Sequence, residues 1–281
     1  MNRRVIARLD IKGPNLVKGI HLEGLRVLGS PEDFAKFYYD QGADELLYQD
    51  VVASLYERNS LREMIISTAS QVFIPLTVGG GIRSIEDIRN VLRSGADKVS
   101  INTAAIKNPD LIKQASKEFG SSTIVIAIEA IRHNDGKYYA YVDNGREETG
   151  EEVLGWAKKV QELGAGEILL TSVDRDGTGE GFDEDLIEMV SSAVSIPVIA
   201  HGGPGRLEDI PLALNKGADA ITVASVIHYD AINKIDYNTS SSEKEGNKEF
   251  LKKGNVSRKI KPCNISNIKN ELTKNNIPCR V

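Results

Sequence analysis

Short apolar runs alternate with longer amphipathic segments along most of the chain. Runs that are almost continuously apolar are typical of strands in a parallel sheet, which is buried on both faces. Most of these runs end in a polar residue or a glycine. The expected strands are Val5–Asp10, Glu45–Asp50, Ile74–Val78, Lys98–Asn102, Ile124–Glu129, Glu167–Ser172, Ile196–Ala200 and Ala220–Ala224.

The amphipathic segments between these runs predict helices, several of which have start and stop signals. Ser30 is a candidate cap and Pro31 suits a first helical turn. Ser84 opens a Ser-x-x-Asp sequence, and Gly95 suits the left-handed residue after a helix. The expected helices are Pro31–Gln41, Ser84–Arg93, Pro109–Phe119, Glu151–Leu163, Asp183–Ala193, Arg206–Lys216 and Ser266–Asn275. Eight strands alternating with helices predict an α/β fold, a (β/α)8 TIM barrel of about 250 residues.

The second half of the chain repeats the first. GADELLYQD (42–50) returns as GAGEILLTSVD (164–174), GADKVSINTA (95–104) as GADAITVASV (217–226), and VGGGI (78–82) as HGGPG (201–205). All three pairs share an offset of about 122 residues, which predicts a twofold internal repeat. Such a repeat predicts two equivalent glycine-rich sites facing each other, and a substrate with two similar ends.

Residues 233–262 break the alternating pattern, because they are polar and charged with almost no apolar periodicity. We expect them to form an insertion after the eighth strand of a single domain that spans residues 1–281. A disordered surface excursion is the interpretation that this composition favours. The alternative is a flap, since a loop after a barrel strand lies on the catalytic face.

Composition and charge exclude several classes of function. The formal net charge of −5 argues against a general nucleic-acid-binding protein, although backbone amides can still bind phosphate locally. We find no run of about 18 apolar residues and no secretory signal, so we expect a cytoplasmic protein without a membrane span. Cys263 and Cys279 are therefore expected as reduced thiols, with a disulfide as the alternative. The four histidines show no metal-ligand spacing, and we expect neither a metal nor a cofactor.

Two glycine-rich segments are candidate phosphate sites. Val78–Ile82 follows the third strand and His201–Gly205 follows the seventh. Glycine lets the backbone approach an anion closely and direct N–H groups at it. A lone glycine triplet usually forms only a turn, but the duplication favours phosphate binding here. We expect Gly81, Asn102 and Thr103 to bind one phosphate, and Gly203, Ala224 and Ser225 to bind the other. The ligand would then be a small-molecule bisphosphate.

Two carboxylates are candidates for acid–base catalysis. Asp10 ends the first expected strand and Glu129 ends the fifth, so the repeat makes them equivalent and places them opposite each other. Such a pair can act as general acid and general base if one carboxyl is protonated and the other ionised. The alternative is a structural role in helix capping or ion pairing. Asp50 and Asp176 form a second symmetric pair that could orient the ligand, and Lys18 could belong to a lid over it.

Several segments closely resemble the cyclase subunit of imidazole glycerol phosphate synthase, in histidine biosynthesis. They are VKGIHLEGLR, DELLYQDVVAS, LTVGGGI, GADKVSINTAA and GEILLTSVDRDGT, and the resemblance covers residues 3–229 and the last helix. It implies that ammonia from a partner glutaminase attacks an open-chain ribulosyl aminoimidazole carboxamide nucleotide with a phosphate at each end. The implied products are imidazole glycerol phosphate and an aminoimidazole carboxamide ribotide. The resemblance also assigns active-site positions to Lys18, Asp50, Thr171, Asp176 and the adjacent Gly177.

The resemblance further implies that ammonia crosses the barrel from its N-terminal face, where the glutaminase docks as the second subunit of a heterodimer. On that path lies a ring of four charged residues, which are Arg4, Glu45, Lys98 and Glu167 here. They precede the first, second, fourth and sixth strands, with two charges of each sign. Charges at a barrel base are costly unless they are paired. The alternative role is therefore a salt-bridge plug that only holds the barrel together.

Three residues depart from the pattern of this family. Glu129 stands where the family has aspartate, and a displacement near 1 Å can cost roughly 100-fold in rate. His201 replaces a small residue, and Arg8 replaces a cysteine. The leading hypothesis is the histidine-pathway cyclase. The alternatives are a paralogue that uses ammonia in amidino-sugar synthesis for bacterial surface glycans, and a non-catalytic barrel that activates a glutaminase.

Overall fold

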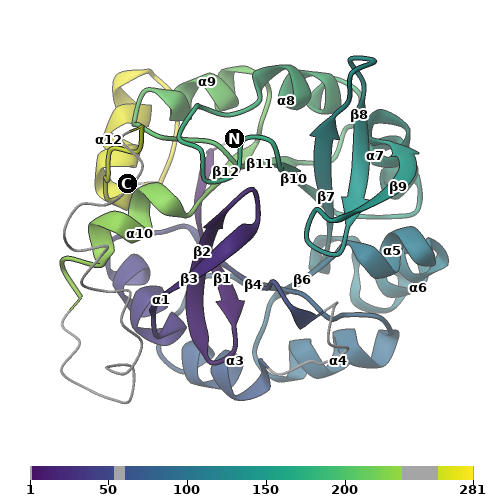
Figure 1. Cartoon of the computed structure of the whole chain (residues 1–281). Helices are drawn as coiled ribbons and strands as arrows, with labels where there is room; N and C mark the ends of the chain where they lie inside the picture. The colour runs from purple at the N-terminus through teal and green to yellow at the C-terminus, as the bar shows by residue number, and fades with distance from the viewer. Residues whose placement is uncertain (1, 54–60, 236–258, 281) are drawn as a thin grey trace.

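The computed structural model describes residues 2–53, 61–235 and 259–280. Within them, eight parallel strands close into a barrel that helices surround (Figure 1). The barrel strands are β1 (Arg4–Lys12), β4 (Glu45–Asp50), β5 (Leu76–Gly79), β6 (Lys98–Ile101), β7 (Ile124–Arg132), β10 (Glu167–Ser172), β11 (Val198–His201) and β12 (Ala220–Val223). Each pairs in parallel with the next, and β12 pairs with β1 to close the ring. The predicted (β/α)8 barrel is confirmed.

The helices begin where the sequence signals indicate. The Oγ of Ser30 accepts a hydrogen bond from the Asp33 amide, and the Oγ of Ser84 accepts one from Asp87. The helices are α1 (Pro31–Asp40), α3 (Arg62–Ala69), α4 (Ile85–Arg93), α5 (Thr103–Lys107), α6 (Asp110–Phe119), α7 (Val153–Glu162), α8 (Glu184–Ser191), α9 (Asp209–Asn215), α10 (Ser225–Ala231) and α12 (Ile265–Lys274). Helices α3, α5 and α10 were not predicted from the sequence, and α5 and α10 are short.

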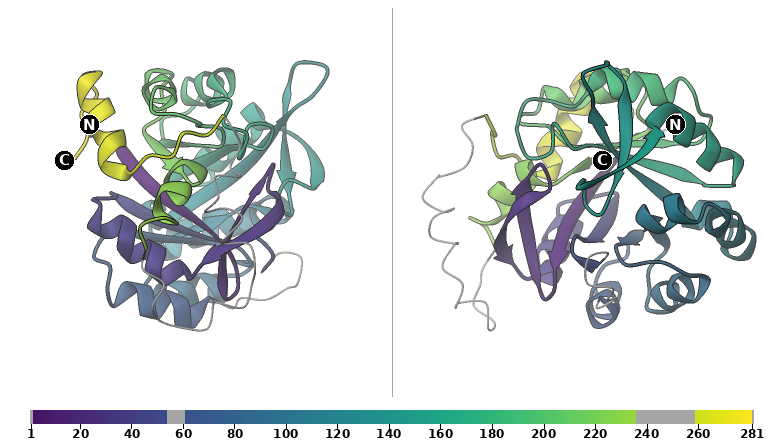
Figure 2. Two further views of the ribbon diagram at one scale, coloured as in Figure 1. Left: turned by 60° about the vertical axis from the view of Figure 1, so that its left-hand side comes forward. Right: turned by 45° about the vertical axis from the view of Figure 1, so that its right-hand side comes forward.

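Two β-hairpins that were not predicted extend the barrel strands. β2 (Asn15–Ile20) and β3 (Glu23–Gly29) follow β1, whereas β8 (Tyr138–Val142) and β9 (Glu147–Glu152) follow β7. Both project from the same end of the barrel (Figure 2, left). They also correct one expectation, because β1 continues beyond Asp10 to pair with β2, and β7 continues beyond Glu129 to pair with β8. The two carboxylates therefore lie within strands rather than at strand ends.

The twofold repeat is visible in the order of the elements. Glu45 and Glu167 begin β4 and β10, and Pro31 and Val153 begin α1 and α7. In both cases the offset is the one seen in the sequence, about 122 residues. The hairpins after β1 and β7 are equivalent in the same way, so the repeat includes them.

Alternate residues of each strand point into the barrel, where the side chains of neighbouring strands stack in layers. The outer faces of the strands belong to the large core under the helices. A separate apolar cluster fills the inside, formed by Ile6, Leu47, Val125, Ala127, Leu169, Ile199 and Ala220. This layer separates the charged residues that begin the strands from the polar residues at the C-terminal mouth.

The end of the chain packs beside its beginning. The Arg3 amide donates to the Pro278 carbonyl at 2.7 Å. Deeper in, the Nζ of Lys269 on α12 lies 2.7 Å from the Oδ1 of Asp44, and the other Asp44 oxygen accepts from the Val5 amide. Both Asp44 and Lys269 are buried. The last helix is thus bonded to the base of the first barrel strand.

The predicted insertion at 233–262 falls mostly on residues 236–258, which lie outside the described residues. Helix α10 lies between β12 and this segment. The residues that follow it pack on the second glycine-rich loop, where the Lys261 amide donates to the Gly205 carbonyl. Cys263 and Cys279 are both free thiols, as expected.

Candidate active site

Four charged side chains form a closed ring at the N-terminal end of the barrel. Arg4 bonds both Glu45, at 2.6 Å, and Glu167, at 3.0 Å. Lys98 lies 3.3 Å from Glu45 and 3.1 Å from Glu167. Burial lowers the pKa of Arg4, but the two carboxylates more than offset this and raise it. Each carboxylate therefore lies between two cations, which compensates the cost of placing charges here.

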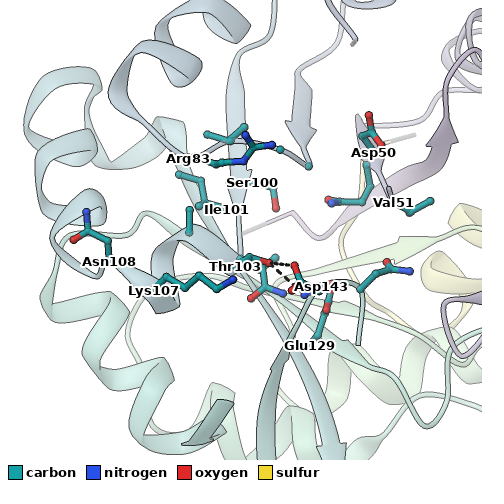
Figure 3. Close-up of a pocket in the computed structure, with 18 residues that line it drawn as sticks. Asp50, Val51, Arg83, Ser100, Ile101, Thr103, Lys107, Asn108, Glu129 and Asp143 are labelled. Carbon is teal, nitrogen blue, oxygen red and sulfur yellow. Dashed lines mark hydrogen bonds between the residues drawn. The ribbon is translucent and has the colours of Figure 1, made fainter. Parts of the chain in front are cut away.

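A cavity of about 360 Å³ opens at the other end of the barrel (Figure 3). Five residues from the predicted site line it, namely Asp50, Gly81, Asn102, Thr103 and Glu129. The side chains of Arg83 and Lys107 also line it, and Figure 3 shows Lys107 reaching toward Thr103 and Asp143. The first predicted phosphate site therefore borders open space and has two cations beside it.

The backbone at this cavity requires glycine. Gly80 has a φ of +98°, and a Cβ there would lie 2.3 Å from the Asp50 carbonyl oxygen. Gly81 also has a positive φ, of 70°. A side chain at Gly80 would therefore displace the end of β4, where Asp50 lies.

Asp10, one member of the predicted acid–base pair, lies in a buried cluster of charges. Its Oδ1 accepts from the Nε of Arg8 at 2.7 Å, and its Oδ2 lies 3.6 Å from the Nζ of Lys18. Lys18 bonds both carboxylate oxygens of Asp176, at 3.0 and 2.9 Å. Burial raises the pKa of Asp10, but Arg8 and Lys18 outweigh this effect, so that the pKa is lowered. Asp10 is thus held as the ionised carboxylate.

His201 completes this cluster as a neutral ring. Burial, together with the charges of Arg8 and Lys18, holds the pKa of His201 well below its usual value. The Nδ1 of His201 lies 3.2 Å from an Arg8 nitrogen. Arg8 can only donate, so Nδ1 accepts and the proton of the neutral ring is on Nε2.

Glu129 has the opposite protonation tendency. It is buried, and burial raises its pKa to about 7 although the Gly145 N–H and the charge of Arg8 act in the other direction. The Gly145 amide donates to Oε2 of Glu129 at 2.7 Å. One carboxyl at the mouth is therefore ionised and the other can hold a proton near neutral pH. Two carboxyls with separated pKa values can serve as base and acid.

The remaining predicted residues are buried around this centre. Thr171 is the register partner of Glu129 on the neighbouring strand. A Cβ on Gly177 would lie 2.6 Å from the Gly19 carbonyl, so the β2–β3 hairpin lies directly against it. The second predicted phosphate site consists of Gly203, Ala224 and Ser225, which do not line the cavity described above. The first glycine-rich site thus lines an open cavity, whereas the second is buried and lies outside that cavity.

Two features of the mouth were not predicted from the sequence. Arg8 and His201 were recognised as departures from the family pattern, but the bonds that Arg8 makes to both His201 and Asp10 were not predicted. The β8–β9 turn, whose Gly145 bonds Glu129, was not predicted either. The signal for that turn was present, because Asn-Gly at 144–145 between alternating residues is a strong hairpin signal.

Within residues 2–53, 61–235 and 259–280, no group of three or more histidine, cysteine or acidic side chains is arranged to hold a metal ion. Among the same residues, no helix has the length and apolar character required to cross a membrane.

Comparisons with known proteins agree on one family. Residues 4–233 match the model of a family described as "Histidine biosynthesis protein". The imidazole glycerol phosphate synthase subunit HisF of Legionella pneumophila is 61% identical over 208 residues, which cover 74% of this chain and 98% of that protein. HisF of Lactococcus lactis is 44% identical and covers 100% of this chain, with 97% of that protein aligned. HisF of Methanocaldococcus jannaschii is 49% identical, over 82% of this chain and 92% of that protein. The chain belongs to the histidine biosynthesis family, and within it to the HisF cyclase subunits of imidazole glycerol phosphate synthase.

Proposed function

We propose that Asp10 and Glu129 are the acid–base pair with which this protein catalyses the cyclase reaction of its family. The reaction uses ammonia and the open-chain ribulosyl aminoimidazole carboxamide nucleotide to form imidazole glycerol phosphate and aminoimidazole carboxamide ribotide. The observation that carries the proposal is the separation of the two protonation states at one mouth, with the pKa of Asp10 lowered and that of Glu129 raised to about 7.

Attack of ammonia on a carbonyl needs a group that removes a proton from nitrogen and a group that delivers one to oxygen. Asp10, as the ionised carboxylate, is the base. Glu129 is the acid, because a carboxyl with a pKa near the working pH both holds and releases its proton. The apolar walls and burial of both groups strengthen these interactions relative to water.

The two phosphates of the substrate would bind at the two halves of the mouth. Gly81, Asn102 and Thr103 line the open cavity together with Arg83 and Lys107, which supports the first site. For the second site we infer Gly203, Ala224 and Ser225, which the repeat relates to the first. Asp50 and Thr171 would orient the middle of the ligand, while Lys18, Asp176 and Gly177 hold the β2–β3 hairpin against the barrel.

We infer a glutaminase subunit as the partner, docked on the N-terminal face. The relatives are named as subunits. The ring of Arg4, Glu45, Lys98 and Glu167 would be the gate through which ammonia enters the apolar interior layer. Phe73, in the segment before β5 at this end, is 76% exposed, and exposed large apolar side chains suit a protein interface. We expect this complex in the cytoplasm.

A paralogue that uses ammonia on a surface-glycan sugar is a second candidate. The observation that favours it is the pairing of Arg8 with both Asp10 and His201 at positions where the sequence departs from the family pattern. A barrel that only activates a glutaminase would not need the separated protonation states of Asp10 and Glu129.

The decisive assay uses the purified protein with an ammonium salt and the open-chain bisphosphate nucleotide. The wild type should form imidazole glycerol phosphate, and Asp10→Asn should abolish turnover. Asp40→Asn, on the exposed face of α1, is the matched control and should retain full activity. Equal background in the wild type and Asp10→Asn would overturn the proposal, and turnover of an amino-sugar substrate instead would favour the paralogue.

A further inference from the structure

The turns of the two unpredicted hairpins meet over the barrel mouth. His21 and Leu22, between β2 and β3, have φ values of 53° and 60°. Asp143 and Asn144, between β8 and β9, have φ values of 53° and 63°. The Nδ2 of Asn144 donates to the Leu22 carbonyl at 2.8 Å, and both groups are buried. The two turns thus adopt the same left-handed conformation and are bonded to each other.

The first of these turns is also fixed to the second half of the barrel. The Leu22 amide donates to Asp176 Oδ2 at 3.3 Å, and the His21 amide donates to the Asp176 carbonyl at 2.9 Å. Lys18, on the same hairpin, bonds the Asp176 carboxylate. Leu22 therefore connects Asp176 on one side to Asn144 on the other.

The second turn reaches the candidate acid. Gly145, the residue after Asn144, donates its N–H to Glu129 Oε2 at 2.7 Å. Gly145 has a φ of +76°, and a Cβ there would lie 3.5 Å from a Leu22 methyl carbon. The orientation of this N–H thus depends on a turn that the Asn144 side chain anchors to the Leu22 carbonyl.

Other groups also face Glu129. Arg8 on β1 and Asp143 in the turn contribute opposite charges, and Asn102 after β6 contributes a polar side chain. Tyr141 on β8 is its register partner, but the Tyr141 hydroxyl bonds His133 instead. Among these groups, the Gly145 N–H and Asp143 belong to the turn that Asn144 anchors.

We propose that Asn144 is a positioning residue for Glu129, because its bond to Leu22 holds the β8–β9 turn where the Gly145 N–H reaches the carboxylate. The position of the β2–β3 hairpin therefore influences how strongly Glu129 holds its proton. This inference rests on the proposed function, in which Glu129 is the general acid. It gives the Asn144–Leu22 contact between the two hairpins a role beyond the acid–base pair itself.

Asn144→Gly tests the coupling, because glycine keeps the left-handed turn and removes only the amide. The measurement is the pH dependence of kcat at a constant concentration of free ammonia. Losing a donor to a carboxylate raises its pKa, so the alkaline limb should move upward by roughly half a pH unit. Asn134→Gly, in the exposed turn between β7 and β8, is the matched control and should not move the limb.

Titration of the Glu129 carboxyl by carbon NMR, assigned with Glu129→Gln, gives a second readout that should move in the same direction. Asn144→Asp is the second variant. It also cannot donate to the Leu22 carbonyl, its charge adds to the upward shift, and it serves if the glycine variant does not fold. If the alkaline limbs of both Asn144 variants superimpose on that of the wild type while Glu129→Gln is inactive, the coupling is overturned but the proposed function is not. A fully active Glu129→Gln would instead overturn the proposed function.

Discussion

Arg8 Nε lies 2.7 Å from Asp10 Oδ1, two residues along the same strand, so the proposed base is paired with a cation from its own strand. Both side chains point into the barrel because residues i and i+2 of a strand share a face. The pairing decides the charge of Asp10: burial raises its pKa, and Arg8 followed by Lys18 reverses that effect.

Replacing Arg8 by methionine should raise the pKa of Asp10 and move the acid limb of the pH–rate profile upward. Asp10 has a lowered pKa in the folded state, so its contribution to stability is present above the unfolded pKa and is lost as the pH falls through the folded value. Because Arg8→Met brings the folded pKa of Asp10 closer to its unfolded value, the loss of stability on acidification should be smaller in the variant than in the wild type. Urea unfolding between pH 3 and 7 measures this, and an unchanged acid limb would contradict it.

Removing the carboxyl of Glu129 should stabilise the protein at alkaline pH. The pKa of Glu129 is about 7 in the folded state and about 4.3 when unfolded, so the folded state binds more protons between these values. Its contribution to stability therefore falls as the pH rises through this window. At pH 8, Glu129→Gln should unfold at a higher urea concentration than the wild type, and its free energy of unfolding should be greater by up to about 4 kcal/mol. At pH 4 the two should be nearly equal, and a difference of the same size at both pH values would contradict the assignment.

Breaking the charged ring should lower the rate with glutamine as the ammonia source more than the rate with free ammonia. Arg4→Ala leaves Glu45 and Glu167 with Lys98 as their shared cation. With the glutaminase partner present, we expect the glutamine-driven rate to fall while the rate with added ammonium salt is largely retained. Arg89→Ala, which removes an exposed ion pair on α4, is the control. Equal loss of both rates would mean that the ring is only structural.

Lys107 should contribute to affinity for the first phosphate. Its side chain lines the cavity beside Thr103. Lys107→Met should raise the KM for the bisphosphate substrate roughly tenfold, the effect of about 1.4 kcal/mol, with a small effect on kcat. Lys117→Met, exposed on α6, is the control and should leave KM unchanged. An unchanged KM in Lys107→Met would place the phosphate elsewhere.

The sequence predicted the barrel well because each of its strands is a buried apolar run and the halves repeat. It predicted the contacts of the mouth less well. Arg8 and His201 are far apart in sequence, and nothing in their local pattern shows that they bond. The hairpin strands were missed because Glu147–Glu152 is almost entirely polar and Asn15–Ile20 mixes apolar and polar residues. Only the Asn-Gly turn gave a local signal for them.

The junction of the first strand and the last helix has a practical consequence. Asp44 receives bonds from Val5 and from Lys269, so residues near both termini meet beside the ring of Arg4, Glu45, Lys98 and Glu167. A purification tag fused to either end would therefore project from the face on which we propose that the glutaminase docks. Assembly assays should use untagged protein, because a failure to bind could reflect the tag alone.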